Sequence, residues 1–386
     1  MNVLPTLPEA ADAPATLLSW FVFDDAMQAW VDVRLEPLPP SANSASGAGH
    51  PATTIASELT LVTWNVDAFS PQSEDRLAGI LDAVRGSGGG GSAFSAAVAT
   101  PTHPDILFLQ EVSPSGLAYL LQDPWVRCHW YVSDTGAAQP SDPNGFSIVS
   151  LVSRRFLPEH WSSSSSSSRT AGIPVLGALW RIDFPSLFGR YAICCEIRMP
   201  DPTAAVVRLV NVHLDSLQIR PSRRPRQLQI VADMLHCQQP RSTSAVATAT
   251  SAMAAHGLVA GDFNPVLPEE DNLLVAANGL VDAWQHLHPD ESGVTWGIDG
   301  QQPYPPARLD KVAVVGLEPC AMTVLHPGTV RLRGGNSSAL DKTATAQAAA
   351  GSDNSSNEHR FLPWSDHSGL QCTFRVAAPR RSFYQD

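Results

Sequence analysis

The sequence predicts an α/β fold in which two packed β-sheets are flanked by helices. Three observations predict it: short apolar runs rich in Val, Ile, Leu and Phe recur along the chain, turn residues bound most of them, and few helical patterns lie between them. A chain of 386 residues, 44% of them hydrophobic, can bury the large core that two sheets require. Many strands with few helices favour sheets packed on each other with the helices outside.

The elements follow one another in a consistent order. The first is an N-terminal hairpin, "LLSWFVFDDAMQAWVDVRL", with Asp24 and Asp25 near its turn; we expect it to pack beside the main domain. Further strands are predicted at residues 59–67, 105–112, 146–156, 191–199, 206–215, 257–264, 308–316 and 369–376. Helices are predicted over 73–86 and 225–238, because each range places apolar side chains on one face at helical spacing.

The chain divides into an N-terminal part, one large domain and a short tail. Residues 1–57 hold the hairpin and a Pro/Ser-rich linker, residues 58–377 form the domain, and residues 378–386 are the tail. Low-complexity insertions interrupt the domain near 86–92, 162–168, 239–256 and 333–358. Such segments cannot bury enough apolar surface to offset the entropy of ordering them, so we expect them outside the core.

Composition limits the classes of partner. The formal net charge is −12, whereas proteins that hold nucleic acid by bulk electrostatics are basic, so a nucleic-acid partner would be held by a local site. The six cysteines show no metal-ligand spacing and are interpreted as reduced core residues of an intracellular protein. No segment has the length and hydropathy of a membrane span, and we expect no membrane partner.

Polar side chains stand at the ends of the apolar runs. They are Asn65 and Asp67 in "TWNVD", Glu111 in "LQEV", His213 in "NVHLDS", Asp262 and Asn264 in "GDFN", Asp310 in "RLD", and Asp366 and His367 in "SDH". One such residue alone is most simply a turn, a cap or a buried histidine. The repetition predicts instead that the strands carry carboxylates, two histidines and two amides to a shared edge.

Such a cluster would be costly without a cation, because neighbouring carboxylates repel and burial penalises each charge. Mg²⁺ suits it, since this ion takes oxygen ligands and needs only one or two protein carboxylates beside substrate phosphate; Mn²⁺ can substitute. The lack of a Cys/His ligand set argues against zinc. Histidines and amides would then contact phosphate oxygens, which is the chemistry of metal-assisted phosphodiester cleavage.

These motifs, in this order, resemble those of the endonuclease/exonuclease/phosphatase superfamily, over about residues 58 to 377. The resemblance implies a four-layered α/β sandwich of two mixed sheets with outer helices. It also implies roles. Glu111 resembles the principal Mg²⁺ ligand, Asp67 a residue that supports the metal, and Asp366 a further metal-site carboxylate. Asn65 resembles a residue that supports the metal and the attacking water, which Asp262 would orient or deprotonate.

The resemblance assigns the remaining residues of the cluster to the phosphate. Asn264 and His213 resemble phosphate-binding groups, and His367 resembles the histidine that stabilises the pentavalent transition state. Asp310 resembles the carboxylate partner that would keep this histidine protonated and oriented.

Longer segments are similar to the 5′-tyrosyl-DNA phosphodiesterase branch. They are "NVHLDS" with "RPRQLQIVADML", and "LVDAWQHLHPDESGVTWG" leading to "RLDKVAV". We therefore expect removal of tyrosyl or related adducts from DNA 5′ ends, with Trp296, Arg226 and Arg308 contacting substrate. One departure is that Pro265, Val266 and Leu267 stand where the branch commonly has a basic residue.

Other functions stay open from the sequence. Alternatives within the superfamily are an abasic-site endonuclease or exonuclease, an RNA deadenylase and a lipid head-group phosphodiesterase. An alternative of another class is a catalytically inactive binding module, which the intact motifs disfavour. The expected partner is a single-stranded DNA 5′ end that carries a protein or tyrosyl adduct. We expect a monomer located in the nucleus, the cytoplasm or both, with a role in DNA repair.

Overall fold

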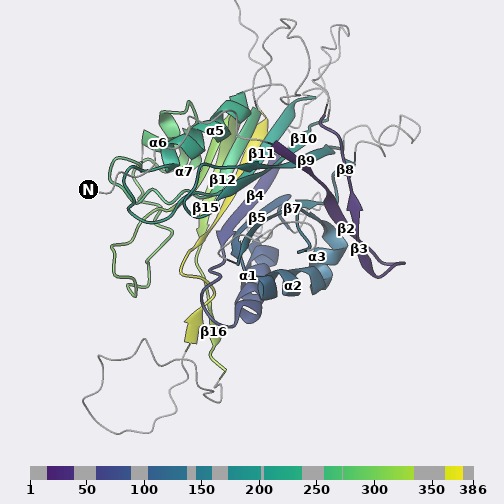
Figure 1. Ribbon diagram of the computed structural model, residues 1–386, viewed down its shortest axis with the longest axis horizontal. Coiled ribbons are helices and arrows are strands. Elements are labelled where there is room, and N and C mark those ends of the chain that lie inside the picture. The colour runs from purple at the N-terminus through teal and green to yellow at the C-terminus, as the bar shows by residue number, and fades with distance from the viewer. Residues whose placement is uncertain are drawn as a thin grey trace, which may run out of the picture.

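The computed structural model describes residues 15–38, 58–87, 103–136, 145–158, 173–200, 204–236, 256–271, 273–333 and 361–376. These residues form two large β-sheets with helices on the outer faces (Figure 1). A small third sheet pairs β16 (Thr329–Arg331) with β17 (Phe361–Pro363). The low-complexity segment 162–168, the linker from residue 39 to 57 and the tail lie outside the described residues, as do nearly all of the other insertions.

Each large sheet has eight strands. The first contains, in spatial order, β1 (Ala15–Leu18), β9 (Val175–Asp183), β10 (Tyr191–Arg198), β11 (Val206–His213), β12 (His256–Asp262), β14 (Asp310–Val315) and β13 (Val281–Asp282), with β8 (Leu157–Pro158) also paired to β9. The second contains β15 (Leu317–Leu325), β18 (Gly369–Val376), β4 (Glu58–Asn65), β5 (Ile106–Val112), β7 (Ser147–Ser153), β6 (Trp130–Val132), β2 (Trp20–Asp24) and β3 (Ala29–Val33).

Both sheets have one parallel strand pair at the centre. In the second sheet β4 pairs parallel with β5, and α1 (Ser73–Ser87) makes the connection. In the first sheet β11 pairs parallel with β12, and α5 (Arg224–His236) lies between them in sequence. Parallel neighbours need such a crossover, and it brings their carboxyl ends to the same edge of the sheet. The strands that flank both pairs are antiparallel to them, and the short outer strand β8 pairs parallel with β9.

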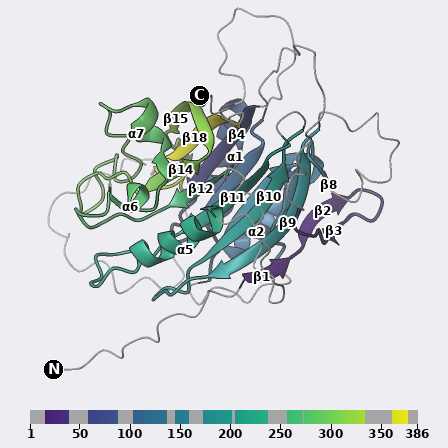
Figure 2. The ribbon, with the colours of Figure 1, turned by 90° about the horizontal axis from the view of Figure 1, so that it is seen from above.

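Three apolar cores separate four layers. The central core joins the inner faces of the two sheets and contains Phe108, Leu209 and Phe374. A second core packs α1 and α2 (Pro114–Gln122) on the second sheet, beside α3 (Pro124–His129), and a third packs α5 on the first sheet. Figure 2 shows α5 on the outer side of the first sheet, and it packs near β11 and β12. The predicted four-layered α/β sandwich is thereby confirmed.

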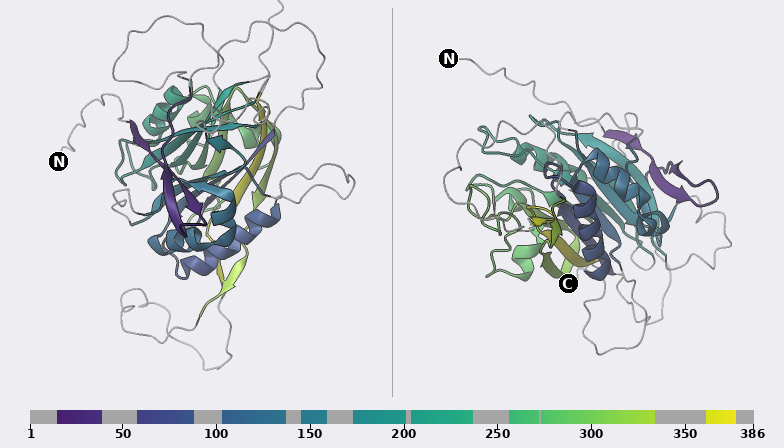
Figure 3. Two further views of the ribbon diagram at one scale, coloured as in Figure 1. Left: turned by 90° about the vertical axis from the view of Figure 1, so that its right-hand side faces the viewer. Right: turned by 90° about the horizontal axis from the view of Figure 1, so that it is seen from below.

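The predicted N-terminal hairpin is present as β2 and β3, and it extends the second sheet through Phe21 and Val132. The preceding strand β1 pairs instead with β9 of the first sheet. A single short segment therefore ties both sheets together along one edge, where the N-terminal strands appear in purple (Figure 3). The Trp20 indole is fully buried there and donates to the Gly177 carbonyl at 3.1 Å.

Several strands were not predicted, among them the two long strands β9 and β15. Strand β15 alternates buried and exposed residues and contains Pro319 next to a register shift, as suits the edge position that it occupies. Cys194, Cys195 and Cys372 are buried as predicted, but Cys128 is exposed on α3, which corrects the prediction that every cysteine lies in the core. Across the described part of the chain, no helix combines the length and hydropathy needed to cross a membrane.

Candidate active site

The predicted polar residues converge at one edge of the sandwich, where the parallel strand pairs end. In the first sheet His213 lies beside Asp262 in register, and Asp262 lies beside Asp310. In the second sheet Asn65 lies beside Gln110, the residue before Glu111. The two sheets meet through Asn65, whose Nδ2 donates to Asp262 Oδ2 at 3.1 Å. Strand pairing therefore brings residues far apart in sequence into one cluster.

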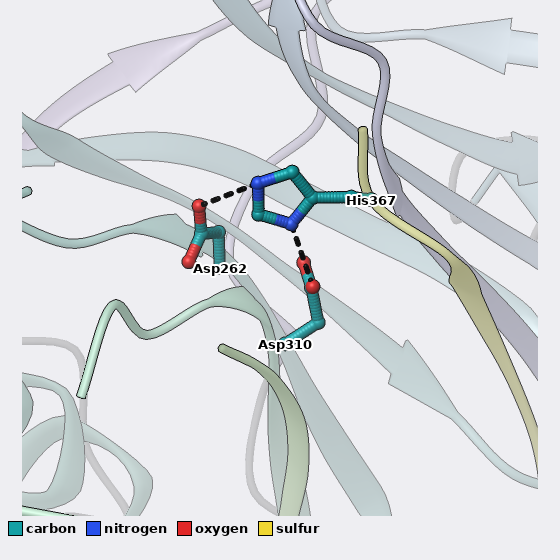
Figure 4. Close-up of side chains that lie close together, drawn as sticks. All are labelled: Asp262, Asp310 and His367. Carbon is teal, nitrogen blue, oxygen red and sulfur yellow. Dashed lines mark hydrogen bonds and ion pairs between the residues drawn. The ribbon is translucent and has the colours of Figure 1, made fainter. Parts of the chain in front are cut away.

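His367 lies between two carboxylates of the first sheet (Figure 4). Its Nδ1 is 2.8 Å from Asp310 Oδ2, and its Nε2 is 4.0 Å from Asp262 Oδ2. Although burial opposes the charged form, the Asp310 and Asp262 carboxylates raise the pKa of His367 well above its usual value. The imidazole is therefore a cation at neutral pH, with its Nε2 proton directed toward the cluster.

Opposing effects act on the pKa of Asp262. Burial raises its pKa to about 7, the His367 cation opposes that shift, and the neighbouring Asp310 and Glu111 carboxylates add to it. Asn65 Nδ2 also lies 3.3 Å from Glu111 Oε1, so one amide links the two carboxylates. A carboxyl group whose pKa lies near 7 is matched to accepting a proton at neutral pH.

His213 is buried and neutral. Burial lowers its pKa well below the usual value, and Arg190 and His367 add to that effect. Its Nε2 is 3.4 Å from Asp262 Oδ2 and 3.7 Å from Glu111 Oε1. Among the described residues neither ring nitrogen has a hydrogen-bond partner. Buried polar atoms are normally paired, so these nitrogens are suited to pairing with a bound group.

The backbone holds several site residues in a sparsely populated conformation. Asp67, Glu111 and Asn264 have φ values of 54°, 56° and 47°, in the left-handed region. Glu111 also lies at a register shift between β5 and β7, where the bulge redirects its side chain. Gly261 has a φ of 137°, and a Cβ there would lie 2.0 Å from the Val212 carbonyl. Strain of this kind commonly clusters at functional sites.

The cluster fits a divalent cation. Asp262, Asp310 and His367 offer ligand atoms within 4.8 Å of one another. However, the protonated ring of His367 has no lone pair to donate, so we read this triad as an acid–base unit. Glu111 is the better ligand candidate, because burial raises its pKa and a cation would offset that cost. The unpaired nitrogens of His213 also suit the predicted contact of this side chain with phosphate.

The other predicted residues flank the cluster. The Asp67 carboxylate accepts from the backbone amides of Phe69 and Ser70. Asp366 Oδ2 accepts from the Trp296 indole at 2.9 Å, and burial raises the pKa of Asp366. Trp296 is half-buried, and its indole N–H positions the Asp366 carboxylate, which is a predicted metal ligand.

Asn264 lies beside Asp262. Its backbone amide donates to Asp262 Oδ1 at 2.9 Å, and its side-chain amide donates to the Leu214 carbonyl. Its position beside Asp262 is compatible with the predicted phosphate contact.

Two predicted substrate contacts lie in other environments. Arg308 is buried, and its Nη1 donates to both carboxylate oxygens of Asp282 at 2.9 and 2.8 Å. This ion pair gives Arg308 a structural partner in place of the predicted substrate. Arg226 is exposed near the start of α5. Its neighbour Arg224 is buried and paired with Glu270, so the basic run is only partly available to a ligand.

Sequence reasoning missed three residues around the site. The Phe146 ring stacks on His213 with centroids 6.0 Å apart, and the Arg190 guanidinium lies 5.1 Å from the Phe146 centroid. Arg76, on α1, is fully buried beside Asp67. Arg190 directly precedes β10, as the predicted residues flank other strands, and Arg76 adjoins the apolar face of α1. These positions, at the start of a strand and beside an apolar helix face, are the sequence features from which Arg190 and Arg76 could have been identified.

The fold and the cluster define a hydrolase of the α/β-sandwich class, with acidic and histidine side chains at strand ends. The chain belongs to the Endonuclease/Exonuclease/phosphatase family, whose model matches residues 62–367. No curated protein sequence matches it significantly. The predicted family membership is confirmed.

Solved structures with the same fold include TDP2 proteins. D. rerio TDP2 complexed with single strand DNA product is 19% identical, with a TM-score of 0.52, over 83% of this chain and 99% of that chain. TDP2 from C. elegans is 19% identical, with a TM-score of 0.51, over 82% of this chain and 75% of that chain. At this identity the likeness establishes the fold.

Proposed function

We propose that this chain is a Mg²⁺-dependent phosphodiesterase that releases a phenolic group, such as a tyrosyl adduct, from a DNA 5′ end. The observation that carries the phosphodiesterase chemistry is the Asp310–His367 pair beside Asp262. It joins a histidine whose pKa the Asp310 and Asp262 carboxylates raise well above its usual value to a carboxyl group whose pKa is about 7. Such a pair of groups can accept a proton from water and stabilise negative charge on a phosphoryl oxygen.

Each residue has a step that its position allows. Asp262 takes a proton from the attacking water, and Asn65, which donates to Asp262, orients that carboxylate. His367 donates a charge-assisted hydrogen bond to a phosphoryl oxygen, while Asp310 keeps its ring protonated. His213 and Asn264 contact the remaining phosphate oxygens. These roles combine positioning with electrostatic stabilisation, which are the main contributions in phosphoryl chemistry.

Glu111, with Asp67 and Asp366 nearby, would hold the cation. When bound, the ion would neutralise negative charge at the phosphate. Burial raises the pKa of Glu111 and of Asp262, and the Asp310 and Glu111 carboxylates add to the shift at Asp262, so the site holds an excess of buried negative charge that a cation would offset. That excess supports a metal-loaded working state, with Mn²⁺ able to replace Mg²⁺.

Three observations support a DNA 5′ adduct as substrate. The motif sequences resemble those of the 5′-tyrosyl-DNA phosphodiesterase branch. D. rerio TDP2, a solved structure with the same fold, is complexed with a single strand DNA product. The net charge of −12 disfavours long tracks along duplex DNA. Trp296 and Arg226 could hold a short strand end by stacking and phosphate contact. A DNA substrate would place the enzyme in the nucleus, the cytoplasm or both.

Val266 and Leu267 stand where the tyrosyl-DNA branch commonly has a basic residue, and this difference affects which leaving group we expect. Val266 and Leu267 are apolar, and Leu267 is buried, so this segment offers no cation. The aromatic ring of Phe146, beside His213, provides an apolar wall, and Phe69 packs edge-on against it at 5.4 Å. A phenolic group could pack there without a salt bridge. Phenolate is also a better leaving group than a sugar alkoxide, so His367 needs to stabilise less charge.

The test is a turnover comparison in Mg²⁺ between a 5′-tyrosyl oligonucleotide and a duplex that contains an abasic site. We expect release of a 5′-phosphate from the tyrosyl strand. Faster turnover of the abasic duplex by more than about tenfold, roughly 1.4 kcal/mol of transition-state stabilisation, would replace the tyrosyl proposal with a repair endonuclease. Recessed 3′ ends, poly(A) RNA and sphingomyelin complete the panel, and no turnover of any substrate would indicate an inactive binding module.

A further inference from the structure

Arg76 joins two loops of the site that come from different parts of the chain. We call residues 66–71, after β4, the Asp67 loop, and residues 364–368, before β18, the His367 loop. The guanidinium of Arg76 donates to five backbone carbonyls: those of Pro71 (3.0 Å), Val66 (3.0 Å), Trp364 (2.7 Å), Ser70 (2.9 Å) and Asp67. Four of these acceptors belong to the Asp67 loop and one to the His367 loop.

The bridging atom is a single nitrogen. Nη1 of Arg76 donates to the carbonyl of Val66 and also to the carbonyl of Trp364, so the two loops share one donor. Only arginine offers five N–H donors in a fixed plane, whereas lysine has three on a flexible stem. The side chain is completely buried, which removes water as an alternative partner for those carbonyls.

The same guanidinium faces the predicted metal-site carboxylates. Its Nη1 lies 3.6 Å from Asp67 Oδ2. Burial lowers the pKa of Arg76, and the charges of Asp67, Asp366 and Glu111 oppose that shift. Arg76 is therefore a fixed internal cation within reach of three acidic groups, besides being a tie between their loops.

Two other contacts hold the His367 loop, but they tie it to β4 and not to the Asp67 loop. Ser365 Oγ donates to the Asn65 carbonyl at 2.7 Å and accepts from the His367 amide at 3.0 Å. The Trp64 indole donates to the His367 carbonyl at 3.0 Å. Both contacts position the His367 loop against the end of β4, but neither reaches the loop that carries Asp67.

We infer that Arg76 is a positioning residue that fixes the Asp67 loop against the His367 loop, so that the acidic groups and His367 are assembled before cation and substrate bind. The inference rests on the metal-dependent part of the proposed function and is independent of which phosphodiester is cleaved. Groups that orient metal ligands from outside typically change metal affinity when they are replaced.

The test compares Arg76→Lys with Arg208→Lys. Arg208 is a matched control, because it is also buried, donates to Glu196 at 3.1 Å and to the Met234 carbonyl at 2.6 Å, and lies on β11. Both variants should unfold at lower temperature. Only Arg76→Lys should weaken Mn²⁺ binding measured by calorimetry, by about 10- to 100-fold. Only this variant should also show faster amide hydrogen exchange in peptides spanning residues 66–71 and 364–368.

Equal Mn²⁺ affinity and unchanged exchange in Arg76→Lys would overturn the inference. If that variant does not fold, Ser365→Ala removes an independent tie of the His367 loop, and it should accelerate exchange in residues 364–368 while leaving 66–71 protected by Arg76. Loss of protection in both segments of Ser365→Ala would show that Arg76 does not hold the Asp67 loop. If the wild-type protein binds no Mn²⁺, the proposed metal dependence fails, and hydrogen exchange still decides the role of Arg76.

Discussion

Burial raises the pKa of Asp262 to about 7, so the folded protein binds a proton that the unfolded chain releases near pH 4. Between these values the native state holds more protons than the unfolded state, and stability falls as pH rises through that window. Asp262→Asn resembles the protonated carboxyl group. We therefore expect the variant to melt several degrees above the wild type at pH 8 and close to it near pH 4, by thermal unfolding in excess chelator.

The same substitution should remove catalysis. Without a carboxylate to accept the proton from water, turnover should fall by a factor on the order of 10² to 10⁴, with substrate binding nearly intact. A variant that is both more stable and inactive would show that the charge of Asp262 is maintained for chemistry at a cost to the fold. Wild-type turnover in Asp262→Asn would refute its assignment as the base.

Substitution of Glu111 tests whether this side chain binds the cation. Glu111→Gln keeps the size of the side chain but removes the charge that a metal would neutralise. We expect Mn²⁺ affinity to fall by at least about tenfold and turnover to fall with it. Glu318→Gln, an exposed glutamate on β15, is the control and should leave both unchanged. Equal metal affinity in the two variants would place the cation elsewhere.

At the scale of elements, the N-terminal segment is a structural tie between the sheets. Trp20, the first residue of β2, is fully buried, and its indole donates to the Gly177 carbonyl of the first sheet. Trp20→Ala should therefore lower the free energy of unfolding by about 3 to 5 kcal/mol, measured by urea denaturation. Met27→Ala, at the exposed turn of the hairpin, should change it by less than about 0.5 kcal/mol. Similar losses in both variants would contradict the role of the segment.

Which elements could be predicted depended on how local their signal is. The helices predicted over 73–86 and 225–238 correspond to α1 and α5, because their apolar faces repeat every three or four residues. Strand β15 was missed, since its edge position allows Pro319 and exposed residues that weaken the strand pattern. The connection of β1 and β2 to different sheets depends on long-range pairing, which no local pattern specifies.

At the scale of the whole molecule, the identity of the clustered residues was predictable and their environment was not. Each of Asn65, Glu111, His213 and Asp262 follows a recognisable apolar run, and strand pairing gathers them as expected. The ion pair of Arg308 was not predicted, because its carboxylate partner, Asp282, lies 26 residues away and is not recognisable as a partner from spacing. The left-handed backbone of Glu111 and Asn264 is likewise imposed by the assembled sheets.

The net charge of the molecule leads to a last prediction about DNA. An acidic protein that holds one strand end should contact few phosphates, and each contact contributes about −0.7 to the slope of log affinity against log salt for single strands. For the Asp262→Asn variant bound to a single-stranded 5′-tyrosyl oligonucleotide at constant Mg²⁺, we expect a slope no steeper than about −2. A much steeper slope would indicate a long basic track.

Arg220 and Arg226, in the basic run after β11, allow the salt dependence to be tested one residue at a time. Arg226 is exposed on α5, whereas the Arg220 guanidinium is 2.9 Å from Glu269. If Arg226 contacts the DNA backbone, Arg226→Gln should make the slope shallower by about 0.7 and weaken binding similarly for all sequences. Arg220→Gln should change neither, because Glu269 already neutralises that side chain. An unchanged slope in both variants would remove the basic run from the DNA path and leave Trp296 and the catalytic cluster to hold the strand end.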